Sequence, residues 1–404
     1  MGDDARIYVA DQMRIKDGTA TDVYFLRTRD ILELANAEGV RVVAEAHSYK
    51  LPNSWSWAVF TGVEEAAWLL EGVDVNVYSM EEGTLFRAME PLLAIEGRYY
   101  DFVTYESSLL GMLRHYSSVS TKAARIKQKA LDKTILFFGI RSVHPAITPM
   151  VDRAAYIGGC DAVSGTLGAE LLGKKPVGTM PHALILALGD QRRAWKAFDE
   201  AMPPDVPRIM LCDTLMDERM EALLAVETLG ERLYGVRLDT PSSRRGNMRE
   251  IVREVRWSLD TVGRRDVKII VSGGVDEKHI EELRDLVDGF GVGTSIAFPP
   301  SIDISLDIVE VDGKPIAKRG KLPGRKQVWR CEEMHDTITS FYKELDKCPA
   351  CGGGVKPLLT PLIQNGKLMR KTPTADEIRD RVLQQLKRLA ELDGFNPEPI
   401  TLVR

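Results

Sequence analysis

The second half of this chain repeats one local pattern, in which a short apolar run ends in glycine or polar residues. The clearest examples are Gly235-Val236-Arg237-Leu238-Asp239, Ile269-Ile270-Val271-Ser272-Gly273-Gly274 and Phe290-Gly291-Val292-Gly293-Thr294. Repeated units of this kind are typical of a parallel α/β sheet or barrel, which builds its site from the carboxyl ends of its strands. The pattern therefore predicts an α/β fold with one shared site at the strand ends.

Two of these strand ends are rich in glycine and follow neighbouring predicted strands. Glycine turns leave backbone N–H groups uncovered, and such groups most often bind phosphate. We expect a phosphate-binding role for Ser272, Gly273, Gly274, Gly293 and Thr294.

The spacing of the predicted elements divides the chain into three domains. Residues 1–120 mix helices and strands without regular alternation, which predicts an α+β domain. Residues 121–300 carry repeated β-α units with short connections, which favour a parallel barrel over a sandwich. Residues 301–404 contain antiparallel-type strands around the turn Asp312-Gly313, a cysteine cluster and a charged helix over 374–392 that we expect to be exposed.

Composition and charge exclude several classes of protein. A net charge of -5 argues against broad nucleic-acid binding. No segment approaches the roughly 18 consecutive apolar residues of a membrane span. The acidic start Met1-Gly2-Asp3-Asp4 has no signal-peptide pattern. We therefore predict a cytoplasmic protein that binds neither nucleic acid nor membrane.

Three of the five cysteines lie close together late in the chain. Cys348 and Cys351 form a C-x-x-C pattern followed by glycines, which is typical of a zinc knuckle, and Cys331 adds a third thiol. His335 is the nearest candidate for a fourth ligand, because four residues after Cys331 it could share the same helical face. The alternatives are an unoccupied thiol pair, a redox C-x-x-C or a metal-free relic of the knuckle. The remaining cysteines, at 160 and 212, are predicted to be buried apolar residues.

Charged side chains lie at or just after several predicted strand ends. Arg237 and Asp239 are two residues apart on one strand, so they point to the same face and could together hold a phosphorylated ribose. Arg141 and Asp213 follow two other strands. An interior salt bridge is the alternative for each residue alone. His182, in Gly178-Thr179-Met180-Pro181-His182, is read as a helix cap, a core histidine, a general base or a nucleophile.

Taken in order, these segments resemble the nicotinate phosphoribosyltransferases of the archaeal type, which belong to the type II phosphoribosyltransferase family. The resemblance covers about residues 15–330 and extends to the late cysteine cluster. The matching segments are Thr21-Asp22-Val23-Tyr24-Phe25, Phe138-Gly139-Ile140-Arg141, Gly178-Thr179-Met180-Pro181-His182, Cys212-Asp213-Thr214, Gly235-Val236-Arg237-Leu238-Asp239, Ser272-Gly273-Gly274 and Phe290-Gly291-Val292-Gly293-Thr294.

The resemblance implies both a fold and a reaction. The fold is an incomplete parallel α/β barrel packed on an α+β domain, here with a small zinc-knuckle-like C-terminal module. In the reaction, nicotinate displaces pyrophosphate from 5-phosphoribosyl-1-pyrophosphate (PRPP) and gives nicotinate mononucleotide in NAD salvage. ATP is a co-substrate, Mg²⁺ arrives with the pyrophosphate, and a structural Zn²⁺ is implied. Homodimers share their active sites and could assemble further.

The resemblance also implies roles for single residues. His182 matches the histidine that ATP phosphorylates, and Asp213 matches a carboxylate that orients the ribose or that histidine. Phe138 and Arg141 match residues that stack on and hold the pyridine ring, and Tyr24 matches a tyrosine that stacks from the neighbouring subunit. The PRPP contacts fall to Thr179, Arg237, Asp239, Ser272, Gly273, Gly274, Gly293 and Thr294.

Other functions stay open at this point. Leu167 is uncharged where nicotinamide-specific relatives carry an acidic residue, which disfavours nicotinamide. A sibling enzyme for quinolinate or nicotinamide is one alternative. A zinc-ribbon protein that binds nucleic acid or another protein is the other, and the basic residues between Lys314 and Arg330 would serve it.

Overall fold

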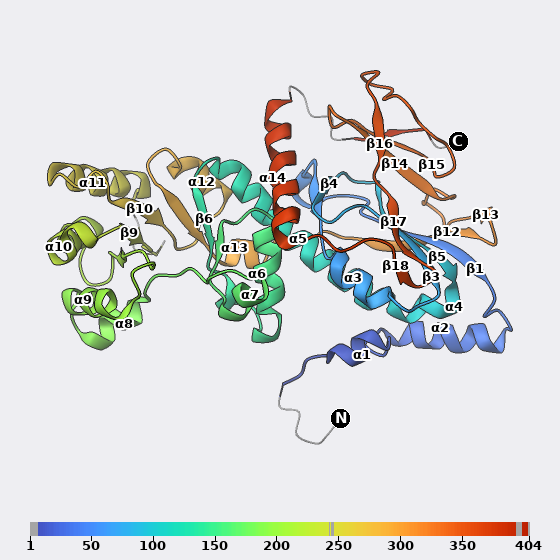
Figure 1. Ribbon diagram of the computed structural model, residues 1–404, viewed down its shortest axis with the longest axis horizontal. Coiled ribbons are helices and arrows are strands. Elements are labelled where there is room, and N and C mark those ends of the chain that lie inside the picture. Colours follow the sequence, from blue (N-terminus) through green and yellow to red (C-terminus); the bar gives the residue numbers. More distant parts are fainter. Residues whose placement is uncertain (1–6, 242, 244–245, 393–397, 403–404) are drawn as a thin grey trace. The chain divides into compact units, whose positions relative to one another are not determined.

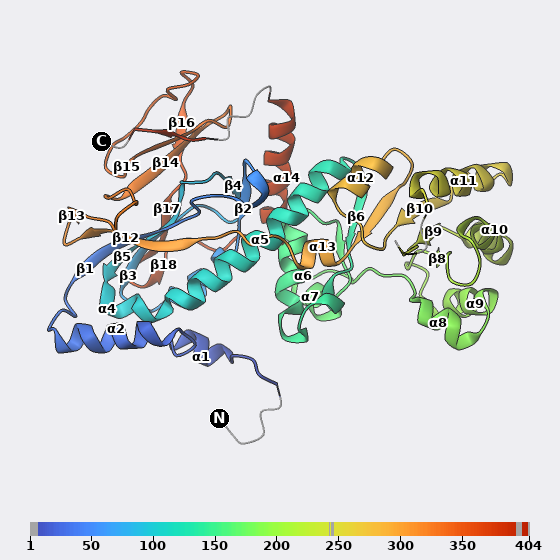
Figure 2. The ribbon, with the colours of Figure 1, turned by 180° about the vertical axis from the view of Figure 1, so that it is seen from behind.

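The computed structural model describes residues 7–241, 243, 246–392 and 398–402, which form two compact units (Figures 1 and 2). The first unit joins residues 1–121 with 300–404, and the second contains residues 122–299. The acidic start Met1–Asp4 lies outside the described residues. The division into three domains stays a prediction.

The second unit is built on a six-stranded parallel sheet in the order β7-β6-β11-β10-β9-β8. Its strands are short and almost wholly buried, as expected where helices cover both faces of a parallel sheet. β7 and β8 are the two edges, so the parallel strands form an open, incomplete barrel, as predicted. The strand bounds are β6 (Thr134–Phe137), β7 (Ala162–Val163), β8 (Ile209–Leu211), β9 (Gly235–Leu238), β10 (Lys268–Val271) and β11 (Gly289–Val292).

Helices connect these strands and lie outside the sheet (Figures 1 and 2). They are α6 (Thr148–Ile157), α7 (Thr166–Leu171), α8 (His182–Leu188), α9 (Gln191–Ala201), α10 (Glu218–Leu229), α11 (Met248–Thr261), α12 (Glu277–Leu283) and α13 (Thr294–Ala297). Two separate helices, α8 and α9, follow directly on one another. The first helix ends because Gly189 takes a left-handed φ of 74°, and the Asp190 side chain then caps the second by accepting from the N–H of Arg193.

The first unit contains a seven-stranded sheet in the order β13-β12-β1-β5-β3-β17-β18. β12 pairs with β1 and β17 pairs with β3, so late strands complete a sheet that begins early in the chain. A buried apolar cluster with Phe60, Leu93 and Ile304 forms its core. The strand bounds are β1 (Arg41–His47), β3 (Val75–Ser79), β5 (Pro91–Arg98), β12 (Ser305–Val311), β13 (Lys314–Pro315), β17 (Thr360–Gln364) and β18 (Lys367–Leu368).

Two smaller sheets and several helices complete this unit. The sheets are β2-β4 and β16-β14-β15-β19. Their strands are β2 (Ala58–Phe60), β4 (Thr84–Phe86), β14 (Lys326–Cys331), β15 (Asp336–Ser340), β16 (Val355–Pro357) and β19 (Ile400–Thr401). The helices are α1 (Gln12–Lys16), α2 (Val23–Leu34), α3 (Val63–Leu70), α4 (Tyr99–Phe102), α14 (Ala375–Glu391) and the first part of α5 (Glu106–Ala130), which continues into the second unit.

The terminal helix α14 begins where the sequence predicts, at a capping box formed by Thr374 and Glu377. The expectation that it is exposed is correct only for its polar face. Ile378, Val382 and Leu386 on the other face are buried, because they pack against other elements of the same unit. In the described part of the chain, no helix is long and apolar enough to cross a membrane.

Candidate active site

A cavity of about 750 Å³ opens at the carboxyl ends of the parallel strands of the second unit. This is where open α/β sheets place their ligand sites, because strand ends and the loops that follow them converge there. Predicted site residues that line the cavity are Phe138, Arg141, Thr179, His182, Arg237, Asp239, Ser272, Gly273, Gly274, Gly293 and Thr294.

Glycine is required at two of these positions by backbone geometry. Gly273 and Gly274 follow β10 with φ angles of 82° and 70°, which side chains other than glycine rarely adopt. A Cβ atom on Gly273 would also lie 2.9 Å from the carbonyl oxygen of Asp239. The bare backbone of this turn therefore borders the cavity, as a phosphate-binding turn must.

A second bare turn faces the same cavity after β11. Gly293 leads into α13, and the Thr294 hydroxyl lies 3.0 Å from the Ser142 hydroxyl. The two glycine turns predicted from the sequence thus border one cavity, which could hold a phosphate between them.

His182 is the first residue of α8, and its ring is held on both sides. Nδ1 lies 3.0 Å from the hydroxyl oxygen of Thr214. Nε2 lies 3.5 Å from Oδ2 of Asp239 and 3.8 Å from Oδ1 of Asp213. A histidine held between a hydroxyl and two carboxylates keeps a fixed orientation, and this arrangement suits a nucleophile or a phosphoryl acceptor.

Asp213 follows β8, is buried and is held from one side only. Its Oδ2 accepts from the backbone N–H of Asp239 at 2.8 Å, whereas Oδ1, which lies near His182, has no hydrogen-bond partner among the described residues. Burial raises the pKa of Asp213 to about 6, although His182 beside it opposes the rise. Asp213 can therefore change its charge near neutral pH.

The opposite carboxylate, Asp239, is fixed by Ser272. The Ser272 hydroxyl donates to Oδ1 of Asp239 at 2.6 Å, which leaves Oδ2 toward His182. Ser272 thus contacts the site through Asp239, in addition to bordering the cavity.

Arg237 brings a partly buried cation to the cavity. One guanidinium nitrogen donates to the carbonyl of Met180 at 3.1 Å, but Nε has no hydrogen-bond partner within the described structure. The guanidinium lies 5.9 Å from the ring centroid of Phe138. Burial lowers the pKa of Arg237, and Asp239 and Asp213 oppose this effect. A partly buried cation with unused donor capacity beside an aromatic ring is suited to an aromatic anion.

Thr214 and Glu221 support the site, although neither was predicted as a site residue from the sequence. Buried Glu221 on α10 accepts from the backbone N–H groups of Thr214, Leu215 and Met216 at 3.0, 2.7 and 2.7 Å. It therefore fixes the loop that carries the Thr214 hydroxyl to His182. The only sequence signal was a carboxylate on the buried face of a helix.

Tyr24 is not among the cavity residues. It lies on α2 in the first unit, where 55% of its surface is exposed and its ring centroid lies 4.1 Å from that of Phe25. An exposed aromatic side chain is available for an intermolecular contact.

The predicted metal ligands do come together, in the first unit. One ligand atom from each of Cys331, His335, Cys348 and Cys351 lies within 4.8 Å of the others. The Cys331 and Cys351 sulfurs are 3.7 Å apart, and Nδ1 of His335 is 3.6 Å from the Cys331 sulfur. Zinc–sulfur bonds of about 2.3 Å in a tetrahedron separate two sulfurs by about 3.8 Å. This spacing fits zinc, and it is far longer than the S–S bond of about 2.05 Å in a disulfide.

The helical relation predicted between Cys331 and His335 is wrong. Cys331 ends β14 and His335 directly precedes β15, so a hairpin turn, not a helix, brings them together. Met334 makes this turn with a left-handed φ of 59°. The cysteines at 160 and 212 are buried, as predicted.

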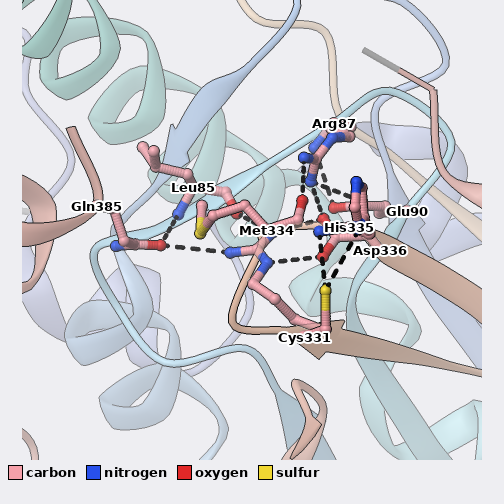
Figure 3. A network of polar contacts seen from close by, with 9 residues as sticks. Leu85, Arg87, Glu90, Cys331, Met334, His335, Asp336 and Gln385 are labelled. Atoms are coloured by element: carbon pink, nitrogen blue, oxygen red, sulfur yellow. Dashed lines mark hydrogen bonds and ion pairs between the residues drawn. The ribbon is translucent and has the colours of Figure 1, made fainter. Parts of the chain in front are cut away.

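Figure 3 shows a buried polar network that holds this hairpin. Arg330 donates to both carboxylate oxygens of Asp336 at 2.7 and 2.6 Å. Arg87, which follows β4, donates to Asp336 and to the carbonyl of Met334. Burial raises the pKa of Glu90 well above its ordinary value, and the nearby Asp336 adds to the rise. Met334 and Asp336, the neighbours of His335, are thus hydrogen-bonded to Arg87, which lies far earlier in the sequence of the same unit.

Comparison with known families gives three matches. The C-terminal domain model of quinolinate phosphoribosyl transferase matches residues 119–307, and its N-terminal domain model matches residues 22–117. The C-terminal domain model of nicotinate phosphoribosyltransferase matches residues 346–392.

Curated relatives cover most of the chain. Nicotinate phosphoribosyltransferase pncB2 of Mycobacterium tuberculosis is 31% identical over 332 residues, which cover 78% of this chain and 69% of that protein. Nicotinate phosphoribosyltransferase of Bacillus subtilis is 28% identical, with 77% and 72% covered.

Solved structures agree with these matches. The structure of nicotinate-nucleotide pyrophosphorylase from Pyrococcus furiosus has a TM-score of 0.94 and 56% identity, and covers 96% of this chain and 99% of that chain. The structure of human nicotinic acid phosphoribosyltransferase shares the fold, with a TM-score of 0.77, 20% identity, and coverage of 95% and 97%.

Proposed function

Because this chain belongs to the nicotinate phosphoribosyltransferase family, we propose that it transfers the phosphoribosyl group of PRPP to nicotinate. The products are nicotinate mononucleotide and pyrophosphate, in NAD salvage. One observation carries the proposal: a single cavity joins two glycine turns with a partly buried cation, Arg237, beside the aromatic ring of Phe138. These are the binding elements that a sugar phosphate and an aromatic carboxylate require.

The cavity residues divide between the two substrates. The pyridine ring stacks on Phe138, and Arg141 and Arg237 attract its carboxylate. The 5-phosphate binds the backbone of the two glycine turns at 272–274 and 293–294. Thr179 lies on the His182 side of the cavity, where its hydroxyl, which has no hydrogen-bond partner in the described chain, can bind PRPP.

In the transfer step, the ring nitrogen of nicotinate forms a bond to C1 of the ribose while the bond from C1 to the pyrophosphate oxygen breaks. Positive charge develops on the ribose, and the Asp239 carboxylate is placed to stabilise it and to hold the hydroxyls. Asp213 and Asp239 are suitable oxygen ligands for Mg²⁺ that enters with PRPP, where the ion would neutralise the leaving pyrophosphate.

ATP coupling is assigned to His182. A ring nitrogen takes the γ-phosphoryl group of ATP, ADP leaves, and later hydrolysis of the phosphohistidine drives the reaction toward product. Thr214 on one side of the ring and two carboxylates on the other fix its orientation. His182 borders the same cavity as the glycine turns assigned to PRPP, which supports coupling of ATP hydrolysis to phosphoribosyl transfer.

A homodimer with shared active sites, or a larger assembly of such dimers, is part of the proposal. Exposed Tyr24 would stack on the ring in the neighbouring subunit. Mixing inactive Tyr24→Ala and Arg141→Ala protomers should restore some activity, because hybrid dimers contain one intact site. No recovery after verified subunit exchange would contradict sharing.

The domains at 1–120, 121–300 and 301–404, and a cytoplasmic location, also belong to the proposal.

The cysteine cluster is proposed to hold a structural Zn²⁺. The four donors of Cys331, His335, Cys348 and Cys351 and their spacing fit a closed tetrahedral site, which leaves no open position for a substrate. Its contribution would be folding energy.

Quinolinate is the second candidate substrate, because quinolinate phosphoribosyl transferase models match residues 22–117 and 119–307. The match at 346–392 favours nicotinate, since it belongs to the nicotinate enzymes. Uncharged Leu167 at the start of α7 disfavours nicotinamide.

The test is product formation from labelled nicotinate, nicotinamide and quinolinate, each with PRPP, Mg²⁺ and ATP. We expect nicotinate mononucleotide from nicotinate, with the other two at least about a hundredfold slower, because a binding site built for one polar group rejects analogues by such factors. Quinolinate consumption with release of CO₂ at a comparable rate would overturn the assignment.

A further inference from the structure

One buried carboxylate of the second unit has no part in the proposed reaction. Asp152 lies on α6, and its side chain is completely buried. Neither oxygen makes a well-formed hydrogen bond with any described residue. Burying a carboxylate without a well-formed hydrogen bond is costly, so the position of this side chain calls for a structural explanation.

Asp152 lies directly against the start of α7. A Cβ atom on Gly165 would lie 1.9 Å from Oδ2 of Asp152, and one on Gly168 would lie 2.2 Å from it. These two positions must therefore be glycine for the carboxylate to fit. The carboxylate contacts backbone where any other residue would place a side chain.

The first turn of α7 lacks a cap of its own. Gly165 is its N-cap residue and has no side chain to accept from the N–H groups that follow. Oδ2 of Asp152, which comes from α6, occupies the position that the side chain of an N-cap residue would take. Burial raises the pKa of Asp152 to about 6, and the N–H of Gly165, which faces it, opposes the rise.

The residue directly before this helix start borders the active-site cavity. Ser164, directly before Gly165, lines the cavity, and so does Ile140. The Cγ2 atom of Ile140 lies 3.2 Å from the position of a Cβ on Gly165. Ile140 itself stands between Phe138 and Arg141 in the sequence, so this wall belongs to the part of the cavity assigned to the pyridine ring.

We propose that Asp152 is a positioning residue that fixes the ring-binding wall by holding the first turn of α7 against Ile140. The inference rests on the proposed function, because the wall matters only if an aromatic ring binds beside it. Asp152 does not contact the substrate. It fixes the positions of Ser164 and Ile140 in the cavity wall against which the pyridine ring binds.

The first test compares Asp152→Ala with wild-type enzyme in steady-state kinetics. We expect KM for nicotinate to rise about tenfold, because a misplaced binding wall loses affinity without changing the reacting groups. We expect kcat and KM for PRPP to stay within about twofold. Asp199→Ala is the matched control, because Asp199 on α9 is also buried but pairs with Arg208, which directly precedes β8, away from the cavity. That variant should lose stability and keep its KM for nicotinate.

A second measurement does not depend on activity. Hydrogen exchange of the amides at 164–172 should be faster in Asp152→Ala than in wild type, and unchanged in Asp199→Ala. If wild-type enzyme shows faster turnover of another ring acid, the proposed function fails and the ring-wall inference falls with it. If exchange at 164–172 and KM for nicotinate are both unchanged in Asp152→Ala while wild type uses nicotinate, the inference alone is overturned.

The glycine at 165 gives a third, compensating test. Gly165→Ala should raise KM for nicotinate, because its methyl group would collide with Oδ2 of Asp152. In the double variant with Asp152→Ala that atom is gone, and the next contact is Ile140 Cγ2 at 3.2 Å. The double variant should therefore be no worse than Asp152→Ala. Independent, multiplying effects of the two substitutions would contradict direct contact between them.

Discussion

Gly291→Ala tests how Phe138 is held in the active site. Gly291 lies within β11, and the ring of Phe138 packs over it. An added Cβ would lie 2.6 and 2.7 Å from two ring carbons of Phe138 and 3.0 Å from Cβ of Ser272. Atoms in ordinary contact are about 3.5–4.0 Å apart, so the ring must move by about 1 Å.

The displacement should weaken stacking on nicotinate. Well-placed aromatic contacts contribute about 0.5–1.5 kcal/mol beyond the area that they bury. Loss of that contribution corresponds to a fall in kcat/KM for nicotinate of about two- to twelvefold. Stability should also fall, since overpacking a buried site costs about 1–3 kcal/mol.

The assay is the initial rate of nicotinate mononucleotide formation at varied nicotinate with saturating PRPP and ATP. Gly289→Ala is the control, because Gly289 lies two residues earlier on the same strand and its added Cβ would meet the Thr134 carbonyl oxygen at 3.0 Å, away from the cavity. It should lower the melting temperature without changing kcat/KM. Equal kcat/KM in Gly291→Ala and wild type, with both folded, would refute the role of Phe138.

Three further predictions concern charge, coupling and metal. His182→Ala should abolish ATP hydrolysis and leave slow phosphoribosyl transfer; hydrolysis at the wild-type rate would reject the phosphoacceptor. Asp213 is protonated below its pKa of about 6 and charged above it, so ATP-coupled kcat should rise as the pH passes through that value. Asp213→Asn should remove this rise. An unchanged rise in the variant would assign the pH dependence to another group. Cys348→Ser should lower zinc content and melting temperature with nicotinate affinity unchanged; wild-type protein purified without chelator and holding far less than one zinc would contradict the metal site.

Strand ends could be predicted from the sequence because each required residue lies within a few positions of its own strand. Arg237 and Asp239 are placed by strand alternation, and Gly273 by its turn, so local patterns were enough to bring them to one edge of the sheet. The helix capped by Thr374 was predictable for the same reason.

Contacts between distant segments were not predictable in this way. Glu221 binds the loop at 214–216 only after α10 has packed, and nothing in its neighbours indicates that role. His335 reaches Cys331 across a hairpin, which a spacing of four residues cannot distinguish from a helix turn. The addition of β12 to β1 joins residues more than 250 positions apart, and only the folded sheet reveals it.

The most direct test of the site is the position of the bound product. A crystal structure of the enzyme with nicotinate mononucleotide and pyrophosphate should place the pyridine ring against Phe138 and its carboxylate at Arg141 or Arg237. The 5-phosphate should lie on the glycine turns at 272–274 and 293–294. Product bound elsewhere, or bound in this cavity with the ring and the phosphate exchanged, would contradict the account.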